Sequence, residues 1–156
     1  MQLEQFLVNA KTACYAGGGA APVTTAPVRT VLADGCIEFT WHDGPFCYRD
    51  RYFGENPFAG EEVVWEDGRV IWVMNYYGVV LDERIPPGPV YAFLQRAMGL
   101  VQTDRPYRGP SYLQEMDFEY FDESQGGSDQ FSGMESICFQ GREIYRLLYH
   151  GGRLKA

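Results

Sequence analysis

Residues 58–82, FAGEEVVWEDGRVIWVMNYYGVVLD, decide the predicted fold, because a related stretch occurs again later in the chain. Shifted by 73 positions, it aligns without a gap on residues 131–155, FSGMESICFQGREIYRLLYHGGRLK. Nine of the 25 aligned positions are identical, where ordinary composition gives roughly one or two by chance. We infer an internal duplication. The duplication is informative about the architecture, but by itself it does not indicate a function.

Both stretches have the pattern of a β-hairpin. The first turns at Asp67-Gly68, a dipeptide favoured in tight turns between strands, and the second turns at Gln140-Gly141. An earlier stretch alternates apolar and polar residues around Asp43-Gly44 in the same way. The sequence therefore predicts three hairpins, formed by residues 36–42 with 46–53, 61–66 with 69–77, and 131–139 with 142–150. A further strand is expected around 118–122.

Two helices are predicted from apolar residues at helical spacing. The first covers residues 3–14 and should end near Tyr15, ahead of the glycines at 17–19. These glycines follow a helix and precede no lysine, so they do not form a phosphate-binding loop. The second helix starts after Pro86 to Pro89 and repeats the Phe-Leu-x-x-Ala string of the first. The apolar positions are Leu3, Phe6, Leu7, Ala10 and Cys14 in one helix and Val90, Phe93, Leu94, Ala97 and Val101 in the other.

These elements predict an α+β fold. We expect one domain over residues 1–156 with two repeats, about 1–85 and 86–156. Each repeat is a helix plus three to four antiparallel strands, and the two are packed with approximate two-fold symmetry. The pattern leaves open whether the two sets of strands join edge to edge or pack face to face.

Composition excludes several classes of function. The formal net charge of −8 would repel a phosphate backbone, so we expect no direct contact with nucleic acid. No signal peptide and no apolar run long enough to span a membrane is present. The four cysteines show no CxxC spacing and are expected to be reduced thiols of a cytoplasmic protein. No metal-binding or cofactor motif occurs, and no nucleophile signature.

The duplicated strands place a carboxylate on the predicted core face twice. Glu62 shares strand parity with Val64, and Glu135 shares it with Ile137. Burial of a carboxylate is costly unless it is paired or hydrogen-bonded. Either backbone NH groups or an arginine satisfy each glutamate, or one or both glutamates line a cleft with a raised pKa. The arginines considered are Arg29, Arg69, Arg108 and Arg142.

Two further features are weaker candidates for a site. Asp50 and Asp122 each follow an aromatic residue at the end of a predicted strand, where aspartate is usually a turn residue. The loop Tyr107-Arg108-Gly109-Pro110 puts an arginine next to an aromatic ring, an arrangement suited to holding an anion or a ring.

Several strings together resemble one known family. They are FL-x-x-A-K, YAGGG, F-x-Y-x-D-x-YFG, F-x-GEE-VVW, IWVMNYYG, PYRGP, FSG-x-E and YHGG, spread over residues 6–152. The combination is similar to the bacterial domain-of-unknown-function family numbered 5680. Members of that family often follow a helix-turn-helix segment of the XRE type, which implies a sensing or regulatory role. Here the first helix runs directly into the repeat, so we expect no DNA-reading function, and the family supplies no catalytic residues.

The favoured hypothesis is a small-molecule or peptide binding module of the sensor type. Its site would be an aromatic-walled cleft formed by Tyr48, Glu62, Trp72, Asn75, Tyr76, Arg108 and Glu135. One alternative is a small enzyme that uses Glu62 and Glu135 for acid–base chemistry, which requires the two carboxylates about 5 to 10 Å apart. The other is an interaction protein that forms a homodimer through its strand edges.

Overall fold

One antiparallel sheet of nine strands dominates the computed structural model, which describes residues 1–15 and 26–155. The strand order across the sheet is β1-β2-β3-β4-β5-β9-β8-β7-β6. The strands are β1 (Val28–Val31), β2 (Ile37–Asp43), β3 (Phe46–Gly54), β4 (Phe58–Glu66), β5 (Arg69–Val80), β6 (Tyr112–Glu115), β7 (Phe118–Gly127), β8 (Gln130–Phe139) and β9 (Arg142–Arg153).

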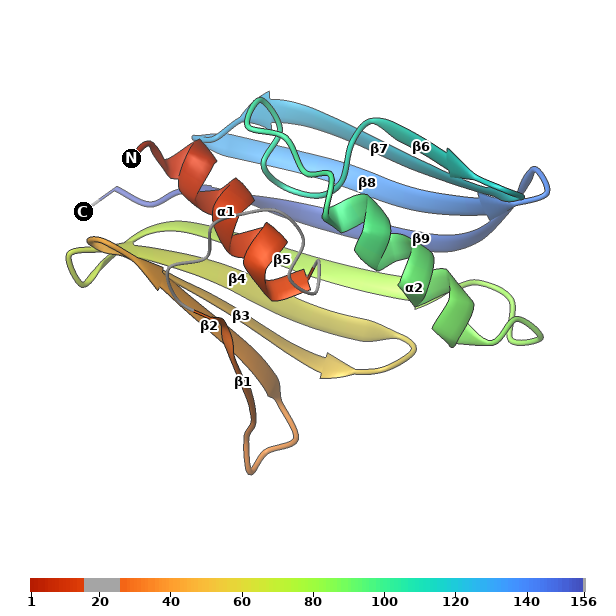
Figure 1. Ribbon diagram of the computed structural model, residues 1–156, viewed down its shortest axis with the longest axis horizontal. Helices are drawn as coiled ribbons and strands as arrows, with labels where there is room; N and C mark the ends of the chain where they lie inside the picture. Colours follow the sequence, from red (N-terminus) through yellow and green to blue (C-terminus); the bar gives the residue numbers. More distant parts are fainter. Residues whose placement is uncertain (16–25, 156) are drawn as a thin grey trace.

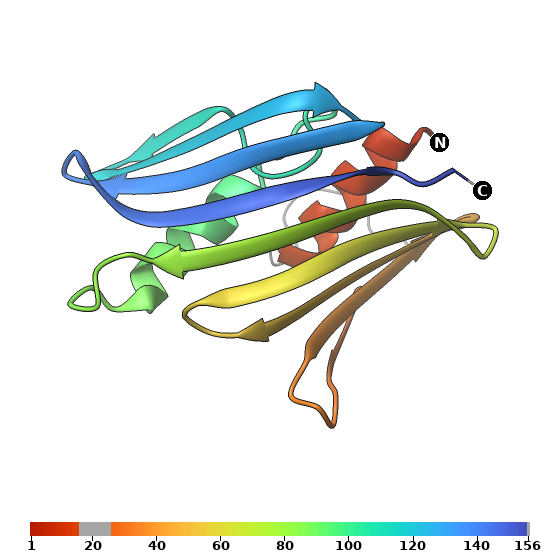
Figure 2. The ribbon, with the colours of Figure 1, turned by 180° about the vertical axis from the view of Figure 1, so that it is seen from behind.

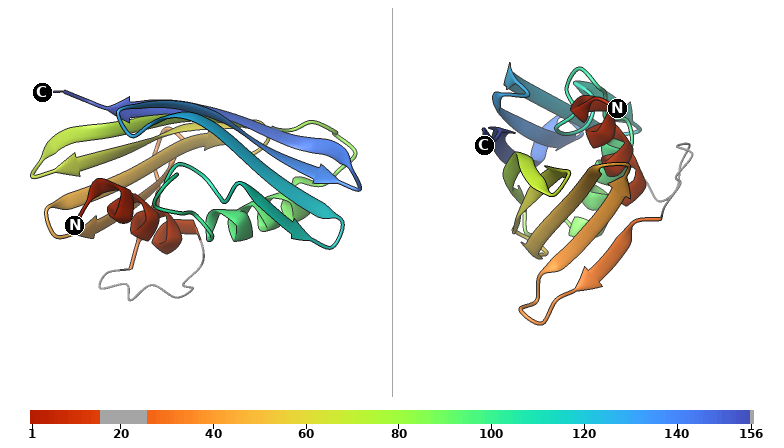
Figure 3. Two further views of the ribbon diagram at one scale, coloured as in Figure 1. Left: turned by 90° about the horizontal axis from the view of Figure 1, so that it is seen from above. Right: turned by 90° about the vertical axis from the view of Figure 1, so that its left-hand side faces the viewer.

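Two short helices, α1 (Leu3–Tyr15) and α2 (Pro87–Met98), lie on the same face of the sheet (Figure 1). Helix α1 packs on β2 and β3, α2 packs on β7, and the two helices touch each other. Seen from behind, the other face carries neither helix (Figure 2). The sheet curves over the helices, so its inner face and the helices enclose the core (Figure 3). Neither helix is long and apolar enough to cross a membrane, in the part of the chain that the structure describes.

Strands β5 and β9 join the two halves of the sheet. They pair in antiparallel register, and Tyr76 lies directly opposite Tyr149. These two tyrosines occupy corresponding positions in the two related sequence stretches. Both side chains point to the inner face, where they are 7% and 2% exposed. The centre of the sheet is therefore built from two strands with the same inward pattern.

The predicted inward face of these central strands is confirmed. Alternate residues are buried because a strand directs successive side chains to opposite faces. The buried set comprises Trp72, Met74 and Tyr76 in β5 and Tyr145, Leu147 and Tyr149 in β9. The predicted tight turns also occur, since Asp67, Gly68, Gln140 and Gly141 all have positive φ.

The expected α+β fold of two helix-plus-strand units is wrong, because the chain is mostly β. The two sets of strands join edge to edge through β5 and β9, which makes one continuous sheet. Strands β1 and β6 lie in segments for which no strand was predicted. Both are four-residue strands at the sheet edges, and most of their residues are exposed, so they lack an apolar alternation. The glycines at 17–19 lie outside the described residues.

Candidate functional site

A cavity of about 460 Å³ lies between the two helices and the inner face of the sheet. We call it the inner cavity. It is lined by residues of α1, α2, β2, β3 and β5, together with the start of β4 and the loop that holds Arg108. Most of its wall is apolar or aromatic, and the side chains include Phe39, Tyr52, Phe58, Tyr91, Leu94 and Met98. Its polar wall includes three buried groups, Asp50, Tyr76 and Arg108, each of which is hydrogen-bonded to another side chain.

Asp50 is the acid in this polar wall. It lies in the middle of β3 with the same inward parity as Phe46 and Tyr48, and it is only 1% exposed. The Tyr76 hydroxyl donates to Oδ1 at 2.6 Å, and the Tyr15 hydroxyl donates to Oδ2. Burial, followed by the nearby charge of Glu62, raises the pKa of Asp50 to about 7. This carboxyl group therefore exchanges its proton near neutral pH.

Glu62, on β4, lies next to Asp50 and is fully buried. The ammonium group of Lys11, also fully buried, donates to its Oε2. Burial lowers the pKa of Lys11, while the charge of Glu62 opposes that change. Oε1 of Glu62 has no hydrogen-bond partner among the described residues. Lys11 and Glu62 form a buried ion pair that ties α1 to the sheet.

Glu135, on β8, is also fully buried and is held by an arginine. Arg108 donates from Nε to Oε2 at 3.0 Å and from Nη2 to Oε1 at 2.9 Å, so both carboxylate oxygens are engaged. The hydroxyls of Tyr120 and Tyr145 donate to the same two oxygens at 2.6 and 3.0 Å. Burial lowers the pKa of Arg108, but the charge and hydrogen bonds of Glu135 outweigh this and raise it overall. The guanidinium also lies over the Tyr76 ring, 5.8 Å from its centroid, and lines the inner cavity.

Asp122, on β7, has surroundings similar to those of Asp50 but does not line the inner cavity. The Tyr149 hydroxyl donates to its Oδ1 at 2.9 Å, as Tyr76 does to Asp50. Arg105 Nη2 lies 3.3 Å from Asp122 Oδ2, an ion-pair contact without hydrogen-bond geometry. Burial, followed by the charge of Glu135, raises the pKa of Asp122 to about 6.

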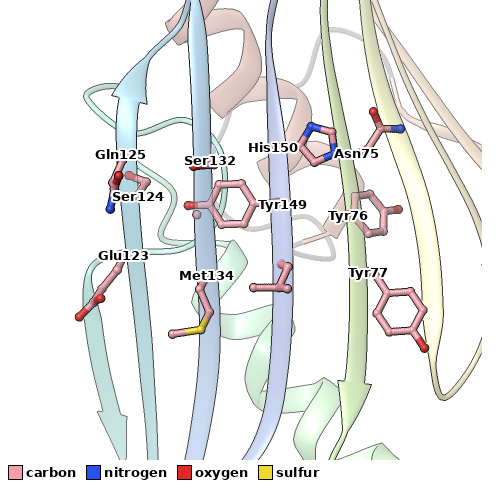
Figure 4. A pocket seen from close by; sticks show the side chains of 12 residues that line it. Asn75, Tyr76, Tyr77, Glu123, Ser124, Gln125, Ser132, Met134, Tyr149 and His150 are labelled. Atoms are coloured by element: carbon pink, nitrogen blue, oxygen red, sulfur yellow. The ribbon is translucent and has the colours of Figure 1, made fainter.

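A second, more open depression of about 790 Å³ lies on the helix-free face of the sheet. We call it the outer depression. Figure 4 shows Asn75 and His150 at the same level of neighbouring strands, where they are register partners. Tyr77 and Leu148 also line it, and both are more than half exposed. It is a shallow hollow in an exposed surface, and the buried carboxyl groups Asp50, Glu62, Asp122 and Glu135 are not among the residues that line it.

The seven predicted site residues are not brought into one place. Arg108 lines the inner cavity, Asn75 lines the outer depression, and Tyr76 lines both. Tyr48, Trp72, Glu62 and Glu135 line neither of them. Tyr48 is buried in the core, and Trp72 stacks on Phe131 with ring centroids 5.6 Å apart. The interpretation that an arginine satisfies a buried glutamate is confirmed for Glu135.

Sequence reasoning missed two groups of the site, Lys11 and Tyr15, and treated Asp50 as a weaker candidate. The interpretation of Asp50 and Asp122 as turn residues is wrong, since both lie within strands and are buried. Strand parity placed Glu62 on the predicted core face. The same argument applies to Asp50, which follows Tyr48 by two positions. Lys11 falls four residues after Leu7 and so shares its helix face.

Other chemistry at this site is limited by the residues present. Cys14 lines the inner cavity, but burial and the charges of Asp50 and Glu62 raise its pKa to about 12. A thiol of this kind is a poor nucleophile at neutral pH. No group of three or more potential metal ligands occurs within residues 1–15 and 26–155.

Comparison with protein families gives one result. The model of a family described as "Domain of unknown function (DUF5680)" matches residues 50–154. This range covers the chain from the middle of β3 to the end of β9, and it includes Asp50, Glu62, Arg108, Asp122 and Glu135. No curated protein and no solved structure is similar enough to this chain to match it. The chain belongs to the DUF5680 family.

Proposed function

We propose that this protein is a binding module that holds a small molecule in the inner cavity. The observation that carries the proposal is the combination of an apolar, largely aromatic wall with a buried acid, Asp50, which among the described residues is bonded to the uncharged hydroxyls of Tyr15 and Tyr76. Pockets for small ligands commonly measure about 300–1,000 Å³ and pair apolar walls with a few polar groups. The volume of about 460 Å³ falls in that range and suits a compact ligand better than a peptide.

The arrangement of the cavity supports binding for a second reason. Its polar groups are held by other side chains: Tyr76 by Asp50, and Arg108 by Glu135. A site whose polar groups are already fixed loses little conformational entropy when the ligand arrives. The buried network therefore gives the cavity a preformed polar wall.

An enzymatic role for Glu62 and Glu135 is less favoured by this arrangement. Each glutamate is bonded to a cation, and neither lines a cavity where a substrate would meet it. Asp50 is the better candidate for proton transfer, because it lines the inner cavity and its pKa is raised to about 7. Acid–base catalysis and homodimer formation through strand edges both stay predictions.

A neutral aromatic probe tests the binding proposal without relying on charge. We expect 2-phenylethanol to bind the protein in the millimolar range or tighter, as ligand-observed saturation-transfer NMR would report. Gln95→Trp places a large side chain on an exposed position that lines the inner cavity, and should weaken this binding. Leu94→Trp fills the cavity from the same helix and should act in the same direction.

The matched control places the same side chain on the other face. Leu148→Trp changes an exposed residue of the outer depression and should leave probe binding unchanged. Circular dichroism establishes that each variant is folded. If the probe does not bind, or if Leu148→Trp abolishes binding while both helix variants retain it, the inner cavity is not the site.

A further inference from the structure

Asp50 differs from the other buried carboxylates in one respect. Glu62, Glu135 and Asp122 each contact a cation, which is Lys11, Arg108 or Arg105 respectively. Among the described residues, Asp50 receives bonds only from the uncharged hydroxyls of Tyr15 and Tyr76. It is also the one member of these four that lines the inner cavity.

Around the inner cavity, the buried charges do not balance. Two cations, Lys11 and Arg108, face three carboxyl groups, Glu62, Glu135 and Asp50. An ionised carboxylate in such a place is costly unless a positive charge lies next to it. Without a ligand, the protein must therefore either keep a proton on one of these three carboxyl groups or bear the free-energy cost of an unpaired buried charge.

Comparison of Asp50 with Asp122 indicates what kind of group would remove the imbalance of buried charges. Tyr149 donates to Asp122 as Tyr76 donates to Asp50, so one side of each carboxyl is bonded in the same way. The second oxygen of Asp122 faces the guanidinium of Arg105 at 3.3 Å. The second oxygen of Asp50 accepts a hydrogen bond from the uncharged Tyr15 hydroxyl instead, and the inner cavity lies beside both groups.

We propose that the inner cavity takes a small organic cation, an amine with an apolar body whose ammonium group contacts Asp50 as Arg105 contacts Asp122. This inference rests on the proposed function and names the chemical class of its ligand. The aromatic rings of the wall suit such a ligand, since ring faces attract cations and ring edges pack on hydrocarbon. Phe58 and Tyr91 meet edge to face there, with ring centroids 5.7 Å apart.

An anionic ligand fits less well. Arg108 is the cation that lines the cavity, and Nε and Nη2 of its guanidinium are bonded to Glu135. An anion would have to compete with that bidentate bond and would also meet Asp50. Lys11, the other nearby cation, is bonded to Glu62 and does not line the cavity.

The proposal predicts that binding is linked to proton release. The groups that face Asp50 are Lys11, Cys14 and Tyr15 from α1, Tyr48 from β3, Glu62 from β4 and Tyr76 from β5. The pKa of Asp50 is raised to about 7 without ligand, and a neighbouring ammonium would lower it. The affinity for a protonated amine should therefore rise as the pH increases from about 5.5 to 8. At higher pH, less binding free energy is used to remove the proton from Asp50.

Three probes with the same aromatic body test the ligand class. Isothermal titration calorimetry at pH 8 compares 2-phenylethylamine, 2-phenylethanol and phenylacetate. We expect the amine to bind about tenfold or more tightly than the alcohol, and phenylacetate to bind least. Equal affinity for amine and alcohol, or tightest binding of phenylacetate, would overturn the ligand class while the cavity remains a binding site. Failure of all three would overturn the proposed function itself.

Two isosteric variants assign the effect to one carboxylate. Asp50→Asn should reduce amine affinity to that of the alcohol, whereas Asp122→Asn should leave the preference intact. Loss of the preference in both, or in neither, would contradict the assignment. Titration of the wild-type protein at pH 6.5 in buffers of different ionisation enthalpy gives a measurement that does not depend on variant folding. It should show release of most of one proton per amine bound, and no release would overturn the proposal.

Discussion

Asp50 links the stability of the folded chain to pH through a single buried carboxyl group. Its pKa is raised from 3.8 to about 7 in the folded state, so this state holds a proton over a range where the unfolded chain has lost it. For such a group, stability is fully present below the unfolded pKa and falls as the pH rises towards the folded pKa. The window is therefore about pH 4 to 7, with the steepest part of the curve below 7.

Between pH 6 and 8 the loss of the Asp50 proton should cost the wild-type protein about 1.4 kcal/mol of unfolding free energy. Urea unfolding at the two pH values measures it. Asp50→Asn should remove most of the loss, because the amide has no proton to release. Asp122→Asn is the control and should retain most of the loss, because the pKa of Asp122 is raised only to about 6 and this group is already about half ionised at pH 6. An equal loss in wild type and Asp50→Asn would refute the linkage.

The buried residues show how far strand parity can be taken. Parity placed Glu62 and Glu135 on the core face, and both are fully buried. The same reasoning would have placed Asp50, but the preference of aspartate for turns was given more weight. Arg108 was one of four arginines considered as partners, but the partner of Glu62 could not be predicted, because Lys11 reaches it across 51 positions of sequence. Contacts of that kind depend on how the elements pack.

At the scale of elements, two glycines make room for the central tyrosines. Gly60 on β4 lies opposite Tyr76, and Gly133 on β8 lies opposite Tyr149. A Cβ atom at either glycine would collide with the facing tyrosine ring. Because the rings cross these strands to reach Asp50 and Asp122, the glycines are part of the same arrangement. This explains why both residue types recur at matching positions of the two related stretches.

Gly133→Ala should therefore destabilise the protein by about 1–3 kcal/mol, since the methyl group displaces the Tyr149 ring from Asp122. Chemical denaturation measures the change. Gly127→Ala is the matched control, because a Cβ atom there meets nothing within 4 Å, and it should shift stability by no more than about 0.5 kcal/mol. Equal effects of the two substitutions would show that close packing at Gly133 is unimportant.

Element prediction succeeded where local signals are strong. The hairpin turns at Asp67-Gly68 and Gln140-Gly141 and both helices follow from dipeptide chemistry and apolar spacing. Strands β1 and β6 were not predicted because each has four residues and none of them is fully buried, so neither strand shows a clear apolar alternation.

For the whole molecule, pairing of β5 with β9 determines the architecture. It joins two sets of strands into one sheet and leaves one face for both helices, which creates the inner cavity between them. The sequence could not show this, because edge-to-edge and face-to-face joining bury the same apolar residues. The cavity walls come from elements far apart in the chain, such as Phe39 on β2 and Met98 on α2.

The most direct test of the central claim is a crystal structure of the protein grown with 2-phenylethylamine at pH 8. We expect the phenyl ring between α2 and the inner face of the sheet, with the ammonium nitrogen about 3 Å from a carboxylate oxygen of Asp50. Amine density in the outer depression, or in the inner cavity with its nitrogen turned away from Asp50, would contradict the account.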